Sequence, residues 1–241
     1  MARMKKQNFA GLLVGLCLCA APIVSRAQTI LPYGDSVTTF GADPESSYRY
    51  WLYQDLTDAG LSFNIIGTRS GVEDGTPANS WPEEEYSGHE GWTSSDAVFS
   101  DNLNPVVALN PDIVLLDFGS NDILEGFDLS TTTAANLQAI IEAFAAQNPN
   151  VIILIAKPTG FVPESDASKE EQHREKSQQS KLTSVVNKVA NLEKKAGRHV
   201  VVVNLYGGFN ARKDTIDGAH PNVKGEQMIA NKYFKALKKV L

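Results

Sequence analysis

Short apolar runs alternate with amphipathic segments along this chain. The apolar runs cover residues 29–34, 63–68, 112–119, 150–158 and 199–206. The central runs are apolar throughout, which is typical of parallel strands covered by helices on both faces. Helical segments are expected over 46–59, over 132–147, over a long stretch that ends near Lys195, and over 222–240. The pattern predicts one doubly wound α/β domain with a five-stranded parallel sheet.

One stretch fits this pattern poorly. Residues 167–180 read ASKEEQHREKSQQS and are polar all round, whereas the residues from Leu182 to Leu192 carry an apolar helical face. We expect the polar stretch to be a solvated helical extension or a loop. It follows the fourth expected strand, so it can still border a site.

The first 27 residues have the pattern of a secretory signal. A basic start and an apolar run lead to Ser25-Arg26-Ala27, so we expect cleavage before Gln28 and a single domain over 28–241. The run is short for a membrane span, and no stop-transfer pattern follows it. Both cysteines, Cys17 and Cys19, lie in this segment and each follows a leucine. The sequence predicts a secreted domain without thiols, a disulfide or a membrane anchor.

Charge narrows the range of partners. Removal of the signal takes away four basic residues and no acids, which leaves 18 basic and 28 acidic residues and a formal charge of −10. Nucleic acid and anionic lipid are poor partners for such a surface. We expect a monomer that needs no cofactor.

In open parallel sheets, ligands bind beyond the carboxyl ends of the strands. That rule selects four segments, which are residues 34–36 (GDS), 88–93 (GHEGWT), 119–122 (GSND) and 217–220 (DGAH). Each one also has an ordinary structural interpretation as a turn or a helix cap. Their joint position at one edge of the sheet favours a site.

The first and last segments supply a nucleophile and a base. Ser36 follows a Gly-Asp turn, where its hydroxyl can face the crevice, although this sequence is also good N-cap chemistry. Asp217 precedes His220 by three residues and can fix its tautomer and stabilise the imidazolium. Pro221 is well suited to the first position of the following helix and makes the corner rigid.

The middle segments supply donors for a negatively charged oxygen. The backbone N–H groups of Ser36 and Gly91 and the side-chain amide of Asn121 are the expected oxyanion donors. Asn121 in an Asx-type turn is the structural alternative.

Together the four blocks resemble the SGNH hydrolases, also called the GDSL lipase/esterase family. GDSVT, SYRYWL, GHEGWT, NPDIVLL and DGAHPN are most similar to the carbohydrate esterase branch that includes acetylxylan esterases. The resemblance implies a flavodoxin-like three-layer α/β/α fold, no metal, and deacylation of esterified sugars. Catalysis would then fall to Ser36, Asp217 and His220.

Other residues have weaker claims. Trp92 is a candidate for stacking on a sugar and Arg49 for binding substrate, although a structural ion pair is the ordinary role for an arginine in an amphipathic helix. Packing is the expected role of Trp81, and a hydrogen bond within its turn that of His89. His173 and His199 are expected at the surface and at a strand edge.

Three alternatives remain open from the sequence. A metal-dependent deacetylase could use Asp35, His89, Asp122 and His220, but the chain has no H-x-x-H or H-E-x-x-H spacing and Ser36 would have no task. A non-catalytic carbohydrate-binding domain could retain the same scaffold. A lipase, lysophospholipase or thioesterase would use the same chemistry on lipid esters.

Overall fold

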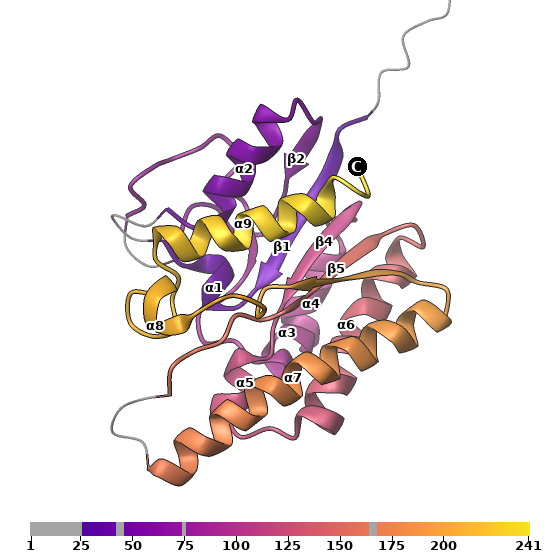
Figure 1. Ribbon diagram of the computed structural model, residues 1–241. Helices are drawn as coiled ribbons and strands as arrows, with labels where there is room; N and C mark the ends of the chain where they lie inside the picture. The colour runs from indigo at the N-terminus through magenta and orange to yellow at the C-terminus, as the bar shows by residue number, and fades with distance from the viewer. Residues whose placement is uncertain (1–25, 42–45, 74–75, 164–167) are drawn as a thin grey trace, which may run out of the picture.

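The computed structural model describes residues 26–41, 46–73, 76–163 and 168–241. It contains a parallel sheet in the order β2-β1-β4-β5-β6 (Figure 1). The strands are β1 (Gln28–Gly34), β2 (Phe63–Ile65), β4 (Ile113–Asp117), β5 (Ile152–Lys157) and β6 (His199–Asn204). All five expected strands are therefore confirmed. A sixth, β3 (Ser87–Gly88), pairs with the end of β1 and was not predicted.

Alternate residues of the strands point into two cores on opposite faces of the sheet. Ile30 and Leu115 belong to the core that contains α2 (Tyr48–Asp58) and α9 (Val223–Leu237). Leu31 and Val114 belong to the other core, which includes residues of α3 (Ser94–Val98), α4 (Ser100–Val107), α6 (Ala134–Gln147) and α7 (Lys169–Lys195). Because a strand turns successive side chains to opposite faces, continuous apolar runs are what this double covering requires. The three-layer α/β/α arrangement is confirmed.

The remaining helical elements are mostly short. They are α1 (Ser36–Thr39), α3 (Ser94–Val98), α4 (Ser100–Val107), α5 (Ser120–Leu124), the π-helical turn η1 (Leu129–Thr133), α6 (Ala134–Gln147), α7 (Lys169–Lys195) and α8 (Ala211–Asp214). Thr93 caps α3 in a reciprocal capping box with Asp96. Helices α2, α6 and α9 fall within or close to the ranges predicted for them.

The polar stretch is the first part of the long helix α7. The prediction of a helical extension is confirmed from Lys169 onwards. The prediction that this stretch is solvated is wrong at two positions, because Glu175 is 5% exposed and Gln179 is 8% exposed. Both face the ends of the strands instead of solvent. Residues 164–167 lie outside the described part of the chain.

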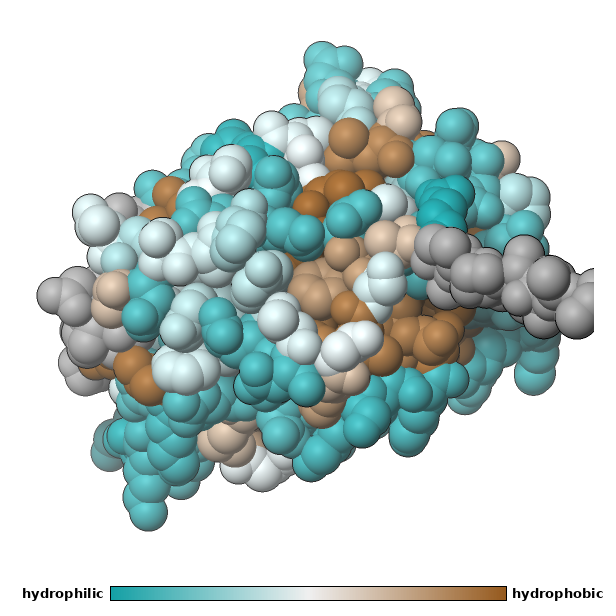
Figure 2. Space-filling view, turned by 90° about the horizontal axis from the view of Figure 1, so that it is seen from above, coloured by the Kyte–Doolittle hydropathy of each residue, from teal (hydrophilic) through white to brown (hydrophobic). Residues whose placement is uncertain are grey.

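Figure 2 shows one face of the surface, where hydrophobic residues gather in a central strip and hydrophilic residues cover most of the rest. Among the described residues, no helix is both long and apolar enough to cross a bilayer. Nearly all of the expected signal segment lies outside the described residues.

Arg49 corrects one expectation from the sequence. Its side chain is fully buried, so it cannot contact a substrate. Its guanidinium donates to the carbonyl oxygens of Thr38 (2.9 Å), Gly71 (2.6 Å) and Glu84 (2.6 Å). It also lies over the rings of two core aromatics, Trp81 at 5.4 Å and Tyr86 at 4.3 Å. Arg49 therefore ties α1, which begins at Ser36, to the loop before β3 through carbonyl groups and ring faces.

Replacement of Arg49 by methionine should destabilise the protein. Three carbonyl groups would lose a charged donor, and leaving buried polar groups unpaired should lower the free energy of unfolding by roughly 3 kcal/mol. Denaturant unfolding measures the change. The control Arg212→Met alters an exposed arginine and should change the free energy by less than about 0.5 kcal/mol. Equal effects of the two substitutions would contradict the role given to Arg49.

Candidate active site

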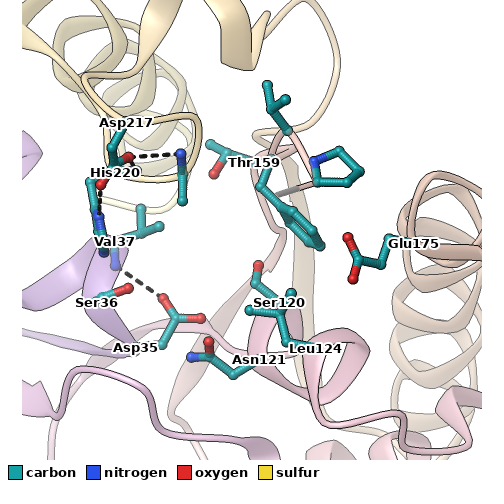
Figure 3. Close-up of a pocket in the computed structure, with 14 residues that line it drawn as sticks. Asp35, Ser36, Val37, Ser120, Asn121, Leu124, Thr159, Glu175, Asp217 and His220 are labelled. Carbon is teal, nitrogen blue, oxygen red and sulfur yellow. Dashed lines mark hydrogen bonds and ion pairs between the residues drawn. The ribbon is translucent and has the colours of Figure 1, made fainter. Parts of the chain in front are cut away.

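A pocket of about 380 Å³ lies beyond the carboxyl ends of β1, β4 and β5. Its lining includes Ser36, Asn121, Asp217 and His220, which come from three of the four segments selected from the sequence. Ser36 and His220 lie on one side of it, and Glu175 lies on the opposite side (Figure 3). The fold thus brings together residues that are more than 180 positions apart in the chain.

Ser36 is the first residue of the short helix α1. The N-cap is Asp35, whose Oδ1 accepts a hydrogen bond from the N–H of Val37 at 3.1 Å. The expected capping function therefore belongs to Asp35, and the hydroxyl of Ser36 lines the pocket. An N–H in the first turn of a helix has no partner within that helix, which makes this end suitable for an anion.

The turn before Ser36 is held against β3 by a close backbone contact. Gly34 pairs with Gly88 in parallel register, and a Cβ on Gly88 would lie 1.8 Å from the carbonyl oxygen of Gly34. Gly88 also has a φ of +122°, which a residue with a side chain rarely adopts. Only glycine at this position allows the GHEGW turn to begin directly beside the nucleophile.

Asp217 orients His220 as predicted from their spacing. Its Oδ2 lies 2.6 Å from Nδ1 of His220, and its Oδ1 accepts the backbone N–H groups of Ala219 (2.9 Å) and His220 (2.8 Å). Burial alone would raise the pKa of Asp217, but the hydrogen bonds from the ring and these N–H groups outweigh it and lower the pKa. The imidazole also stacks on Phe40, with ring centroids 4.9 Å apart. Nε2 is thus the ring nitrogen left for a reacting group.

The corner after His220 differs from the prediction in one detail. Pro221 forms an isolated bridge with Thr215 and precedes the N-cap of α9 instead of opening the helix. The cap is Asn222, whose Oδ1 accepts the N–H of Gly225 at 3.1 Å. Its Nδ2 donates to the carbonyl oxygen of Thr215 at 3.2 Å. The loop that carries His220 is therefore closed at its base by the helix cap.

Asn121 lies in the first turn of α5, with its side chain at the pocket (Figure 3). Its Nδ2 donates to the carbonyl oxygen of Trp92 at 2.9 Å, which uses one of the two amide hydrogens. The next residue, Asp122, is fully buried and accepts hydrogen bonds from the N–H of Ser94 (2.8 Å), from the hydroxyl of Ser94 and from Thr133 Oγ1 (2.7 Å). Asp122 thereby fastens the GHEGW turn to α5.

Gly91 and Trp92 lie next to the pocket but are not among the residues that line it. Gly91 is exposed, with a φ of +73°. The half-buried ring of Trp92 packs against a hydrophobic core and stacks on His89, with centroids 5.8 Å apart. The stacking of Trp92 on a sugar therefore has no support from its position. Gly91 as an oxyanion donor remains a prediction.

Two buried acids, Asp35 and Asp117, lie close to Ser36. Asp117 ends β4, and neither of its carboxyl oxygens has a hydrogen-bond partner among the described residues. Its carbonyl oxygen accepts the N–H of Asp35 at 3.3 Å. Burial and the nearby Asp35 raise the pKa of Asp117 well above its ordinary value. Burial likewise raises the pKa of Asp35 to about 7, although the Val37 N–H and His220 act in the opposite direction.

The far wall of the pocket was anticipated only for the polar stretch 167–180, which was expected to be able to border a site. Thr159, Phe161, Val162 and Pro163 follow β5, and Glu175 comes from α7. Ligands bind beyond the carboxyl ends of parallel strands, and this rule also points to the residues that follow the apolar run 150–158. The sequence therefore contained a signal for these four residues. Glu175 lies in the polar stretch that was expected to be able to border a site, but its burial was not predicted, because a glutamate in a polar helix is usually solvated.

The residues suggested for a metal site have other partners. Nδ1 of His89 lies 2.7 Å from Glu73 Oε1, and Asp122 is occupied by Ser94 and Thr133. Within the described ranges, no group of three or more His, Cys, Asp or Glu residues is arranged to hold a metal ion. His173 and His199 are exposed, and His199 begins β6.

Comparisons with known proteins agree with this architecture. Residues 33–228 match the model of the GDSL-like lipase/acylhydrolase family, and the chain belongs to that family. The structure is similar to a family 3 carbohydrate esterase from Clostridium thermocellum, with 28% identity, 89% of this chain and 97% of that chain covered, and a TM-score of 0.70. It is also similar to a family 3 carbohydrate esterase from Talaromyces cellulolyticus, with 21% identity, 88% of this chain and 97% of that chain covered, and a TM-score of 0.74.

A curated relative is the multidomain esterase of Ruminococcus flavefaciens. It is 23% identical over 240 residues, which cover 91% of this chain and 30% of that protein. This chain therefore spans less than a third of the length of that relative. The family and the carbohydrate esterase neighbours support an esterase.

Asn121 provides a test of oxyanion stabilisation. Asn121→Ala should lower kcat for an acetyl ester by on the order of a hundredfold, because one donor to the developing oxyanion is lost. Asn121→Asp keeps the shape but replaces the donor with a carboxylate, so its loss should be at least as large. Steady-state kinetics with p-nitrophenyl acetate measures both. A kcat within threefold of wild type in either variant would contradict the assignment.

Asp35 provides a test of stability against pH. Its ordinary pKa is 3.8 and its folded value is about 7, so between these values the unfolded chain is ionised while the folded carboxyl stays protonated. The contribution of Asp35 to stability should therefore fall as the pH rises through this window. Asp35→Asn keeps a capping oxygen and does not titrate, so its unfolding free energy relative to wild type should increase from pH 4 to pH 7.

The control for this test is Asp35→Ala. It lacks both the charge and the cap, so it should show the same trend with pH, offset by a loss of about 1 kcal/mol. Denaturant unfolding at several pH values measures all three proteins. A difference between wild type and Asp35→Asn that does not change with pH would show that Asp35 is not held protonated by burial.

Proposed function

We propose that this protein is a secreted esterase that removes small acyl groups, chiefly acetyl, from carbohydrate such as acetylated xylan. The observation that carries the proposal is one pocket lined by Ser36, Asn121 and an Asp217–His220 pair with a 2.6 Å contact at Nδ1. These groups supply a nucleophile, an oxyanion donor and an oriented base.

In the proposed reaction, His220 Nε2 takes the proton of Ser36 as Oγ attacks the ester carbonyl. The backbone N–H groups of Ser36 and Gly91 and the amide of Asn121 stabilise the oxyanion. The imidazolium then protonates the leaving sugar alkoxide, and an acyl-enzyme remains on Ser36. Water, deprotonated by His220, attacks this ester, and the imidazolium returns the proton to Ser36 Oγ as the acid leaves. Asp217 stays ionised throughout and stabilises the imidazolium.

Size and chemistry of the pocket support a short acyl group on a sugar. A volume of about 380 Å³ is near the lower end for small-molecule sites. Its walls combine the polar side chains of Ser120, Thr159 and Glu175 with apolar ones, as a sugar with hydroxyl groups and carbon faces requires. The similarity to two family 3 carbohydrate esterases supports the same substrate class.

Lipid esters are the second candidate. Leu124 lines the pocket with half of its surface exposed, and Phe161, Val162 and Pro163 extend the apolar wall. Such a wall can also accept a longer acyl chain. The formal charge of −10 expected after signal cleavage opposes binding to an anionic membrane.

A panel of substrates on wild type and Ser36→Ala tests the proposal. Wild type should release acetate from acetylated xylan and prefer p-nitrophenyl acetate to the butyrate and octanoate esters. Ser36→Ala should lose roughly 10⁶-fold in kcat, because removal of the nucleophile leaves only binding and the oxyanion donors. Acetate release by Ser36→Ala at the wild-type rate would refute a serine esterase, and equal rates on long chains would favour the lipid candidate.

A covalent label distinguishes this mechanism from metal-assisted hydrolysis. A serine-directed phosphonate should stop activity and add its mass to the peptide that contains Ser36. A chelator should leave the rate unchanged. Loss of activity with the chelator, with no adduct on Ser36, would favour a metal-dependent deacetylase.

A further inference from the structure

A second pocket lies beside the first, beyond the ends of β5 and β6. It also has a volume of about 380 Å³. Its walls come from the segment after β5, including Gly160 and Phe161, and from the segment after β6, including Tyr206 and Phe209. No step of the proposed reaction uses it.

The two pockets share a wall. Phe161 lines both of them. A void too small for a water molecule is lined by Thr159 and Phe161 of the catalytic pocket and by Gln179 and Tyr206 of the second pocket, so the two walls pack closely on each other. A ligand that occupies both pockets would pass over Phe161.

Hydrogen bonds hold this shared wall in place. Gln179 of α7 clamps the backbone of Phe161, with Nε2 donating to its carbonyl oxygen at 3.0 Å and Oε1 accepting its N–H at 3.3 Å. The N–H of Tyr206 donates to the carbonyl oxygen of Lys157 at 3.0 Å. Lys232 of α9 donates to the carbonyl oxygens of Leu205 and Gly207, both at 2.7 Å. The second pocket is thus fixed to β5 and to both helical layers.

The ring of Tyr206 is backed by Gly160. A Cβ on Gly160 would lie 3.3 Å from Cε2 of the tyrosine, so the ring packs closely on a residue without a side chain. Tyr206 is half-buried and remains part of the pocket wall. A supported aromatic ring with accessible surface is suited to stacking on the carbon face of a sugar.

The lining also specifies the charge of the ligand. Besides aromatic rings it consists of glycines, one alanine and the amide side chains of Gln179 and Asn210, with no acidic or basic side chain among these described residues. Amide and backbone groups can hydrogen-bond hydroxyl groups, and none of these lining residues is a cation that could hold a carboxylate or a phosphate. The ammonium of Lys232, close by, donates to the carbonyl oxygens of Leu205 and Gly207. A neutral sugar fits this lining better than an anionic one.

We propose that the second pocket binds a neutral sugar residue of the same glycan whose acyl group enters the catalytic pocket, with Tyr206 as the stacking residue. This inference rests on the proposed function and extends it from a single acylated sugar to a chain. The esterase then distinguishes oligosaccharides by length, through contacts made away from the scissile bond.

Kinetics on two lengths of substrate tests this. We would measure kcat/KM for acetylated xylo-oligosaccharides of two and of six units, and take their ratio as the gain from chain length. In wild type, kcat/KM should be higher for the six-unit substrate than for the two-unit substrate. Tyr206→Ala should lower the gain by roughly fivefold, the size of a lost stacking contact, and Tyr206→Phe should retain it. A Tyr206→Ala gain equal to that of wild type would overturn the proposal.

A binding measurement covers the case in which Tyr206→Ala does not fold. Ser36→Ala should bind unacetylated xylohexaose several-fold more tightly than xylobiose in calorimetric titration, and equal affinities would overturn the second pocket. Failure of the proposed function looks different, since acetate release would then be absent at both lengths or would persist in Ser36→Ala.

Discussion

The site depends on a backbone contact between β1 and its neighbours. Gly34 at the end of β1 lies against Gly88 on one side, and Asp117 accepts the N–H of Asp35 on the other. These contacts join segments that begin near residues 34, 88 and 117. Because all three strands are parallel and end at one edge, the nucleophile turn, the GHEGW turn and the GSND turn emerge together. Without the contact between Gly34 and Gly88, the GHEGW turn would have to start at least the width of a side chain away from the end of β1.

The acidic residues of the motifs have separate tasks that their sequence positions do not reveal. Asp35 caps α1, Asp122 fastens the second turn to α5, and Asp217 alone contacts the imidazole of His220. A carboxylate in a conspicuous motif is a candidate metal ligand when only its identity is known. Burial and hydrogen-bond partners separate these three, and they also explain why the pKa of Asp35 rises while that of Asp217 falls.

The sequence predicted the five long strands, because continuous apolar runs leave few alternatives in a covered parallel sheet. It also predicted the Asp217–His220 contact, because three residues of a turn confine both side chains. It could not predict β3, which has two residues and is defined by its pairing with β1. For Arg49 the sequence suggested substrate binding or a structural ion pair, because the usual partners of a guanidinium are anions, whereas here carbonyl groups from three segments accept its hydrogen bonds.

The two sides of the site rest on different supports. Ser36, Asn121 and His220 are held by the ends of β1 and β4 and by the cap of α9. The opposite wall is held by β5, β6 and α7, where Gln179 fixes Phe161 and Arg174 donates to the carbonyl oxygen of Ile123 at 3.1 Å. The polar start of α7, which was expected to be mainly solvated but able to border a site, therefore contributes to the wall of the pocket. The wall meets the loop of the base where the N–H of Val162 donates to the carbonyl oxygen of Gly218 at 2.8 Å. Side-chain substitutions that keep this backbone contact can therefore alter the choice of substrate and leave the orientation of the base intact.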